Sequence, residues 1–147
     1  MSTIDQLSSL QAFIGKEFSA SPSPFMLWLK PIVLSAECGK LAFQYTVRHE
    51  MTNPIKGLHG GVTAAIMDDI IGATMFSLNE EHFYTTVNNV IDYFSPAREG
   101  DLIIAETNII RKGKQIVNAQ CEIWNADKTR LIARGYSNLL KTTLKKE

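Results

Sequence analysis

The stretch Gly60–Leu78, GGVTAAIMDDIIGATMFSL, is mostly apolar and is too long for a β-strand, so it predicts one long central helix. This helix has no broad polar face, which indicates either nearly complete burial or a membrane span. Asp68 and Asp69 decide between the two, because a lipid bilayer heavily penalises two carboxylates at mid-span. A helix buried in a protein core is therefore the better interpretation.

β-strand patterns flank the central helix on both sides. Two apolar, alternating runs precede it, Met26–Ala36 and Leu41–Arg48, and the tight turn between them predicts a hairpin. Pro31 lies in the first run and indicates that this strand is an edge strand or contains a bulge. Four more runs follow it: Phe83–Phe94, Asp101–Arg111, Gln115–Trp124 and Arg130–Leu140. Their connections are too short for crossover helices, so we expect successive strands to pair antiparallel. The pattern predicts an α+β fold in which a curved antiparallel sheet wraps around one helix.

The first segment, residues 1–19, predicts an amphipathic helix that packs as an appendage. Its apolar residues recur at near-helical spacing, and Ser2 or Thr3 is placed to cap its start. The Ser/Pro-rich loop Ser19–Pro24 then forbids continuation of this helix. With 147 residues, the whole chain 1–147 is sized for a single domain.

Composition narrows the class of protein. Lys and Arg together number 15, as do Asp and Glu, so there is no overall positive field for nucleic acid or an anionic membrane. The N-terminus lacks the pattern of a signal peptide, and we expect a cytoplasmic protein. The two cysteines and three histidines do not fall at metal-ligand spacings, so we expect no disulfide, no metal and no resident cofactor.

Two adjacent aspartates inside an apolar helix need a partner or a function, because an unpaired buried carboxylate costs several kcal/mol. Small residues lie one turn from Asp68, at Ala64, Ala65 and Gly72, and they leave space for a substrate or for another helix. The two aspartates project about 100° apart, so they should not share one role. Backbone capping or an ion pair across a dimer explains them equally well.

The segment before the helix is the second candidate. Gly60 and Gly61 expose backbone N–H groups at the positive end of the helix dipole, a place suited to a developing oxyanion, although a tight turn explains them as well. His59 is a candidate base or nucleophile, but a loop histidine more often hydrogen-bonds backbone. Serine hydrolase, nucleotide-binding and dinucleotide-binding motifs are absent from the sequence.

Three motifs carry a family resemblance over about residues 53–134. The run from His59 to Asp68 resembles the HGG-x-x-x-x-x-x-D signature of PaaI-like hotdog thioesterases, the phenylacetate-pathway family. Tyr93-Phe94-Ser95-Pro96 resembles the Y-x-x-P motif of that family, and Arg111-Lys112-Gly113-Lys114 resembles its basic R-x-G-K turn. The resemblance implies a hotdog fold and hydrolysis of an acyl-coenzyme A thioester, with an aryl or aliphatic acyl group.

The resemblance also implies roles for single residues. Asp68 is the general base or nucleophile, and the Gly60 amide polarises the carbonyl. Asn53 holds the carbonyl or a water, and Thr86 orients the water. The basic turn Arg111, Lys112, Gly113 and Lys114 is the candidate for the coenzyme phosphates, or else a solvated hairpin tip. The candidates for an acyl pocket are Met67, Ile71, Met75 and Phe94, each equally plausible as core.

The family resemblance further implies a homodimer with shared active sites, assembled as a homotetramer. Asn53 and Gly60 of one chain would face Asp68 and Thr86 of its partner. Coenzyme A is then part of the substrate rather than a cofactor. The alternatives are a hotdog module that binds acyl-coenzyme A without catalysis, a hotdog dehydratase or hydratase, and a plain scaffold protein.

Overall fold

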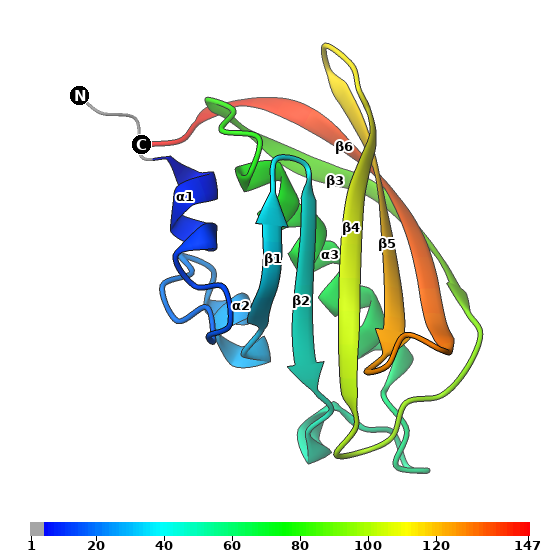
Figure 1. Cartoon of the computed structure of the whole chain (residues 1–147). Helices are drawn as coiled ribbons and strands as arrows, with labels where there is room; N and C mark the ends of the chain where they lie inside the picture. Colours follow the sequence, from blue (N-terminus) through cyan, green and yellow to red (C-terminus); the bar gives the residue numbers. More distant parts are fainter. Residues whose placement is uncertain (1–4) are drawn as a thin grey trace.

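The computed structural model describes residues 5–147, in which a six-stranded antiparallel sheet curves around one long helix (Figure 1). The central helix is α3, Gly60–Phe76, close to its predicted bounds. The strands are β1 (Ile32–Glu37), β2 (Lys40–Thr46), β3 (His82–Tyr93), β4 (Leu102–Lys112), β5 (Ile116–Asn125) and β6 (Leu131–Lys145). They are ordered β1-β2-β4-β5-β6-β3, so β1 and β3 form the two edges.

The expected pairing of successive strands holds for β4 with β5 and for β5 with β6, but it is wrong for β3 and β4. β3 pairs with β6, and the chain then crosses to the far side of β5 to begin β4 beside β2. The crossing segment is bound to other loops, because the Leu58 N–H donates to Ala97 O and the Gly100 N–H donates to Val47 O. These contacts replace direct β3–β4 pairing.

The core lies between α3 and the inward faces of the strands. The helix contributes Ile66, Met67, Ile70 and Ile71, each at most 1% exposed. One stripe of α3 stays accessible in the single chain, with Gly61 and Asp68 exposed. The expectation of nearly complete burial was therefore wrong for this stripe.

The first helix is shorter than expected. α1 spans Gln6–Gln11, and the Asp5 side chain caps it by accepting a hydrogen bond from the Ser8 N–H. The predicted caps Ser2 and Thr3 lie outside the described residues. α1 ends with Ala12 as its C-cap, and the chain then turns at Gly15, whose φ of +83° belongs to the left-handed region that glycine adopts readily.

The predicted first strand begins too early, because Pro24–Leu29 forms a second helix, α2. Ser23 caps this helix by accepting from the Met26 N–H, and Pro24 occupies the first turn, where its missing N–H costs nothing. Lys30 adopts a left-handed conformation that ends the helix. Pro24 therefore lies in the first turn of a new helix, whereas the sequence analysis considered only that it ends the preceding one.

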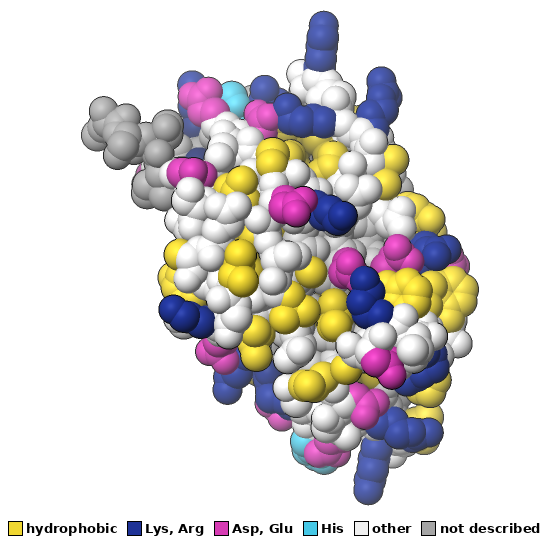
Figure 2. All heavy atoms as spheres, in the orientation of Figure 1, with side chains coloured by type: hydrophobic (Ala, Val, Ile, Leu, Met, Phe, Trp, Pro, Cys, Tyr) yellow, Lys and Arg dark blue, Asp and Glu magenta, His cyan; other side chains and the backbone are white. Residues whose placement is uncertain are grey.

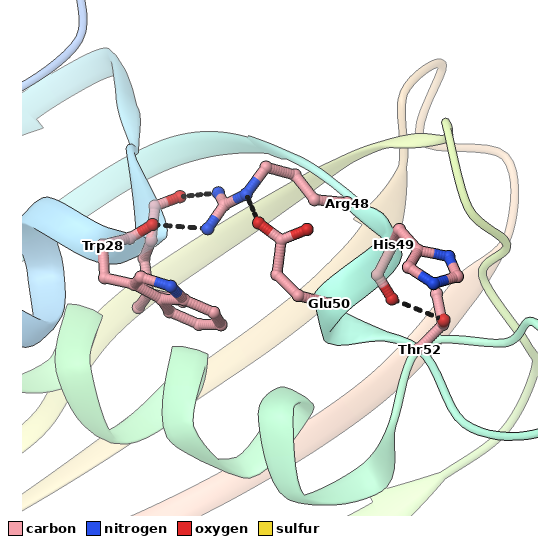
Figure 3. Close-up of polar contacts among 6 residues, drawn as sticks. Trp28, Arg48, His49, Glu50 and Thr52 are labelled. Atoms are coloured by element: carbon pink, nitrogen blue, oxygen red, sulfur yellow. Dashed lines mark hydrogen bonds and ion pairs between the residues drawn. The ribbon is translucent and has the colours of Figure 1, made fainter.

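Arg48 holds the C-terminal end of α2 in place (Figure 3). Its guanidinium donates to the backbone oxygens of Trp28 at 2.6 Å and Leu29 at 3.3 Å, and it lies 4.9 Å from the centre of the Trp28 ring. It also pairs with Glu50 at 2.8 Å. These contacts satisfy carbonyl groups that the end of a helix leaves without partners.

We expect Arg48→Lys to lower the free energy of unfolding by about 1 to 2 kcal/mol, because an ammonium cannot reproduce the forked contacts to two carbonyls. Glu50→Gln is the matched control, and it should cost less because half-exposed ion pairs contribute little. Chemical denaturation of both variants measures the difference. An equal loss in the two variants would show that the ion pair, and not the carbonyl contacts, holds α2.

None of the helices within residues 5–147 combines the length and apolarity that crossing a membrane requires.

Candidate functional site

Two hydrogen bonds hold the Asp68 carboxylate against the edge strand β3. Asp68 Oδ1 accepts from Thr86 Oγ1 at 2.9 Å and from Asn89 Nδ2 at 3.2 Å. Asn89 is itself oriented by Ser137 of β6, whose hydroxyl donates to Asn89 Oδ1. We call Asp68, Thr86 and Asn89 the acid half of the site.

Asn89 was not among the residues singled out from the sequence. Side chains alternate along a strand, so residues three apart, such as Thr86 and Asn89, normally face opposite sides. The pairing of β3 with β6 shifts register between Thr86 and Asn88, and this irregularity turns both side chains toward α3. The three-residue spacing alone therefore argued against Asn89.

The expectation that Asp68 is buried was wrong for the single chain, in which the residue is exposed. Asp68 points from the accessible stripe of α3 toward β3, and the far side of β3 carries no neighbouring strand within the described chain. Thr86 and Asn89 are exposed as well. The carboxylate is thus held in position but remains open to a substrate or to a second chain.

The first turn of α3 presents backbone donors. His59 caps the helix, since its Nδ1 accepts from the Gly61 N–H at 2.9 Å. The Gly60 N–H has no acceptor among the described residues, while the Gly60 carbonyl accepts from the Tyr93 hydroxyl at 2.7 Å. An unengaged N–H at the positive end of a 17-residue helix can stabilise negative charge. The imidazole of His59, by contrast, is occupied as a cap.

Asn53 organises the loop that leads into this turn. Its Oδ1 accepts from the N–H groups of Ile55 at 3.1 Å and Gly57 at 3.0 Å. Its Nδ2 makes no hydrogen bond within residues 5–147 and is left as a donor. We call Asn53 and Gly60 the donor half of the site.

Within one chain the two halves are too far apart to act on one carbonyl. Gly60 and Asp68 are eight residues apart on the same continuous helix, and a rise of about 1.5 Å per residue separates them by about 12 Å. A nucleophile and an oxyanion donor must both lie about 3 Å from the reacting group. Each chain therefore carries two incomplete halves.

The predicted phosphate-binding turn lies elsewhere. Arg111 and Lys112 end β4, and Gly113 and Lys114 form the turn to β5. This turn is a hairpin tip, and Figure 2 shows basic side chains there, at the top of the view. Lys112 forms an ion pair with Glu80, which follows α3, and this contact raises the pKa of the lysine. The tip thus lies near the opposite end of α3 from Gly60.

Three of the four residues considered for an acyl pocket are core residues. Met67 and Ile71 are 1% exposed and Met75 is 4% exposed, whereas Phe94 is 56% exposed. A substrate cannot reach the first three without opening the core.

Asp69 occupies a different environment from its neighbour Asp68. Its Oδ2 is buried without a hydrogen-bond partner, as is the hydroxyl of Tyr45 on β2. Burial, reinforced by the negative charge of Asp68, raises the pKa of Asp69 to about 7. Burial and the charge of Asp69 raise the pKa of Tyr45 well above its usual range. The two aspartates therefore lie in different environments, in line with their angular separation.

Asp69 should make the stability of the fold depend on pH. Because its pKa is near 7 when folded and 3.8 when unfolded, the folded state retains a proton that the unfolded state loses as pH rises between these values. The free energy of unfolding should therefore fall with rising pH. Asp69→Asn removes this dependence. The difference in free energy of unfolding between the variant and wild type should therefore shift in favour of the variant by about 2 to 3 kcal/mol from pH 5 to pH 8.

Denaturant titrations of both proteins across this pH range measure the difference. Parallel pH profiles for wild type and Asp69→Asn would contradict the assignment of a buried titrating carboxyl to Asp69.

No cluster of three or more His, Cys, Asp or Glu side chains suited to a metal ion occurs within residues 5–147. The two cysteines are free thiols, Cys121 buried and Cys38 exposed.

Comparison with known proteins places the chain in a family. Residues 56–132 match the family model described as the thioesterase superfamily. The chain is 31% identical over 106 residues to acyl-coenzyme A thioesterase 13 of Homo sapiens, covering 72% of this chain and 76% of the human protein.

Solved structures show the same fold. The E. coli PaaI protein of the phenylacetic acid degradation operon matches with a TM-score of 0.81 at 18% identity, covering 97% of each chain. The smu.793 protein of Streptococcus mutans, solved bound to acetyl CoA, matches with a TM-score of 0.71 at 20% identity, covering 78% of this chain and 90% of that one.

The chain belongs to the thioesterase superfamily, a family of thioester hydrolases. The hotdog fold and the PaaI-like resemblance expected from the sequence are confirmed.

Proposed function

We propose that this protein hydrolyses acyl-coenzyme A thioesters at sites built from the acid half of one chain and the donor half of another. The observation that carries the proposal is the Asp68 carboxylate, oriented by Thr86 and Asn89 and left open at the sheet edge. The human relative named as an acyl-coenzyme A thioesterase and the neighbour solved with acetyl CoA support this substrate class.

The chemistry of a thioester suits these residues. A thiolate, whose conjugate acid has a pKa of about 8.5, leaves readily, so the reaction needs a base or nucleophile and a polarised carbonyl more than a strong acid. Asp68 serves as general base toward water or as the nucleophile itself. Thr86 donates one hydrogen bond to Asp68 and retains lone pairs to orient the water.

The donor half receives the thioester carbonyl. The Gly60 N–H points from the helix start, where the dipole favours negative charge, and it stabilises the oxyanion as the carbonyl is attacked. Asn53 Nδ2 supplies a second donor, because its Oδ1 is fixed by the loop backbone. Tyr93 holds the Gly60 peptide from the carbonyl side.

A second copy of the chain joins the two halves. β3 is a 12-residue edge strand, and its exposed apolar side chains include Val87 at 59% and Val90 at 57%. Such an edge invites pairing with another strand. Two-fold pairing of β3 with the β3 of a partner would set each donor half against the acid half of the other chain and bury Asp68. Further assembly into a tetramer is part of this proposal.

The coenzyme phosphates are proposed to bind the basic hairpin tip. Arg111 and Lys114 make no ion pair within the described chain, whereas Lys112 is engaged by Glu80. The first two are therefore the stronger candidates for phosphate contacts.

Thiol release from a panel of acyl-coenzyme A substrates tests the proposal. We expect wild type to turn over at least one of them and Asp68→Asn to lose at least about 100-fold in rate, as loss of an essential base commonly does. Glu37→Gln, which removes an exposed carboxylate on β1 far from the site, is the control and should match wild type. Tight binding without turnover by wild type would instead indicate a non-catalytic acyl-coenzyme A module.

A further inference from the structure

A cavity of about 420 Å³ lies between α2 and the start of α3. Its size falls within the range that small-molecule ligands fill, about 300 to 1,000 Å³. The residues that line it are Phe25 and Trp28 from α2, His59, Gly61, Val62 and Ala65 from the start of α3, and Glu50 and Thr52 from the segment between them.

Aromatic rings form one wall of this cavity. Phe25 and Trp28 stack with their centres 5.8 Å apart and their planes at 22°, yet they remain 44% and 40% exposed. Arg48 fixes this wall, because it binds the backbone oxygen of Trp28 and lies over its ring (Figure 3). The wall is therefore held in place at Trp28, and it is apolar and uncovered in the single chain.

The cavity continues into the proposed catalytic site. His59 and Gly61 line it, and these residues flank Gly60, whose N–H is the proposed oxyanion donor. Gly61 and Ala65 lie seven and three residues before Asp68, so all three share one stripe of α3. A thioester carbonyl at Gly60 would have its acyl group beside the cavity.

We propose that this cavity binds the acyl group of the substrate and that Phe25 and Trp28 select uncharged, extended apolar acyl chains over acetyl. This inference rests on the proposed function. The carboxylate of Glu50, which also lines the cavity, is already paired with Arg48 at 2.8 Å, and no Lys or Arg is among the lining residues, so the cavity offers no free cation to an acyl chain that ends in a carboxylate.

The aromatic wall lies outside the segment that matches the family model. Phe25 and Trp28 precede residue 56, where that match begins. The selectivity is thus assigned to a feature of this chain's own α2, which was not recognised from the sequence.

The rate constant kcat/KM measured along a series of straight-chain acyl-coenzyme A substrates tests the assignment. For wild type, kcat/KM should rise by up to about fourfold per added methylene until the cavity is filled, as expected for burial of apolar surface. In Phe25→Ala and in Trp28→Ala the rise should flatten, so the loss grows with chain length. Ala65→Phe, which fills the cavity from α3, should flatten the series in the same way.

Leu27→Ala is the matched control, because Leu27 lies on the same helix at 42% exposure and does not line the cavity. The control should keep the chain-length dependence of wild type. The assignment would be overturned if the cavity variants lost the same factor in kcat/KM at every chain length, or if Leu27→Ala flattened the series as they do.

Binding of non-hydrolysable S-alkyl-coenzyme A thioethers by calorimetry separates this assignment from the proposed function. Affinity that rises with alkyl length in wild type but not in Trp28→Ala supports the pocket even if no substrate is hydrolysed. Hydrolysis by a wild type that shows no length dependence in rate or affinity refutes the pocket while leaving the thioesterase function intact.

Discussion

The stiffness of α3 is the constraint on which the proposed chemistry depends. The helix runs unbroken from Gly60 to Phe76, so the N–H that opens it and the Asp68 carboxylate remain about 12 Å apart. Within one molecule, no loop movement brings these groups to one carbonyl while the helix is intact. Under the proposed mechanism, this separation means that a single chain holds both halves of the site but needs a partner to complete it.

β3 connects this constraint to the rest of the fold. Thr86 and Asn89 hold the acid from this strand, and Tyr93 from its end holds the Gly60 peptide. The same strand has the free, apolar edge on which a second copy would pair. Pairing would therefore complete the site and remove the acid from solvent in one step, which links assembly to activity.

The fold was largely predictable because the strands alternate in polarity and α3 is an apolar run too long for a strand, and the HGG-to-Asp68 motif located Asp68 and the helix start. Besides the pairing of β3 and the exposure of Asp68, the sequence did not reveal α2 or Asn89. Pro24 was interpreted as a helix breaker, although a capped first turn tolerates proline, so α2 and its aromatic wall were missed. Asn89 was missed because the irregularity in β3 depends on pairing with β6, a strand some fifty residues later that the local pattern does not reveal.

The most direct test mixes two inactive variants, Asp68→Asn and Asn53→Ala, by unfolding and refolding them together. If each site takes its acid from one chain and its donors from the other, half of the sites in a mixed dimer are intact. Activity should then recover to about one quarter of wild type, since random pairing makes about half of the dimers mixed. A mixture that forms mixed dimers yet stays as inactive as its components would contradict the shared site.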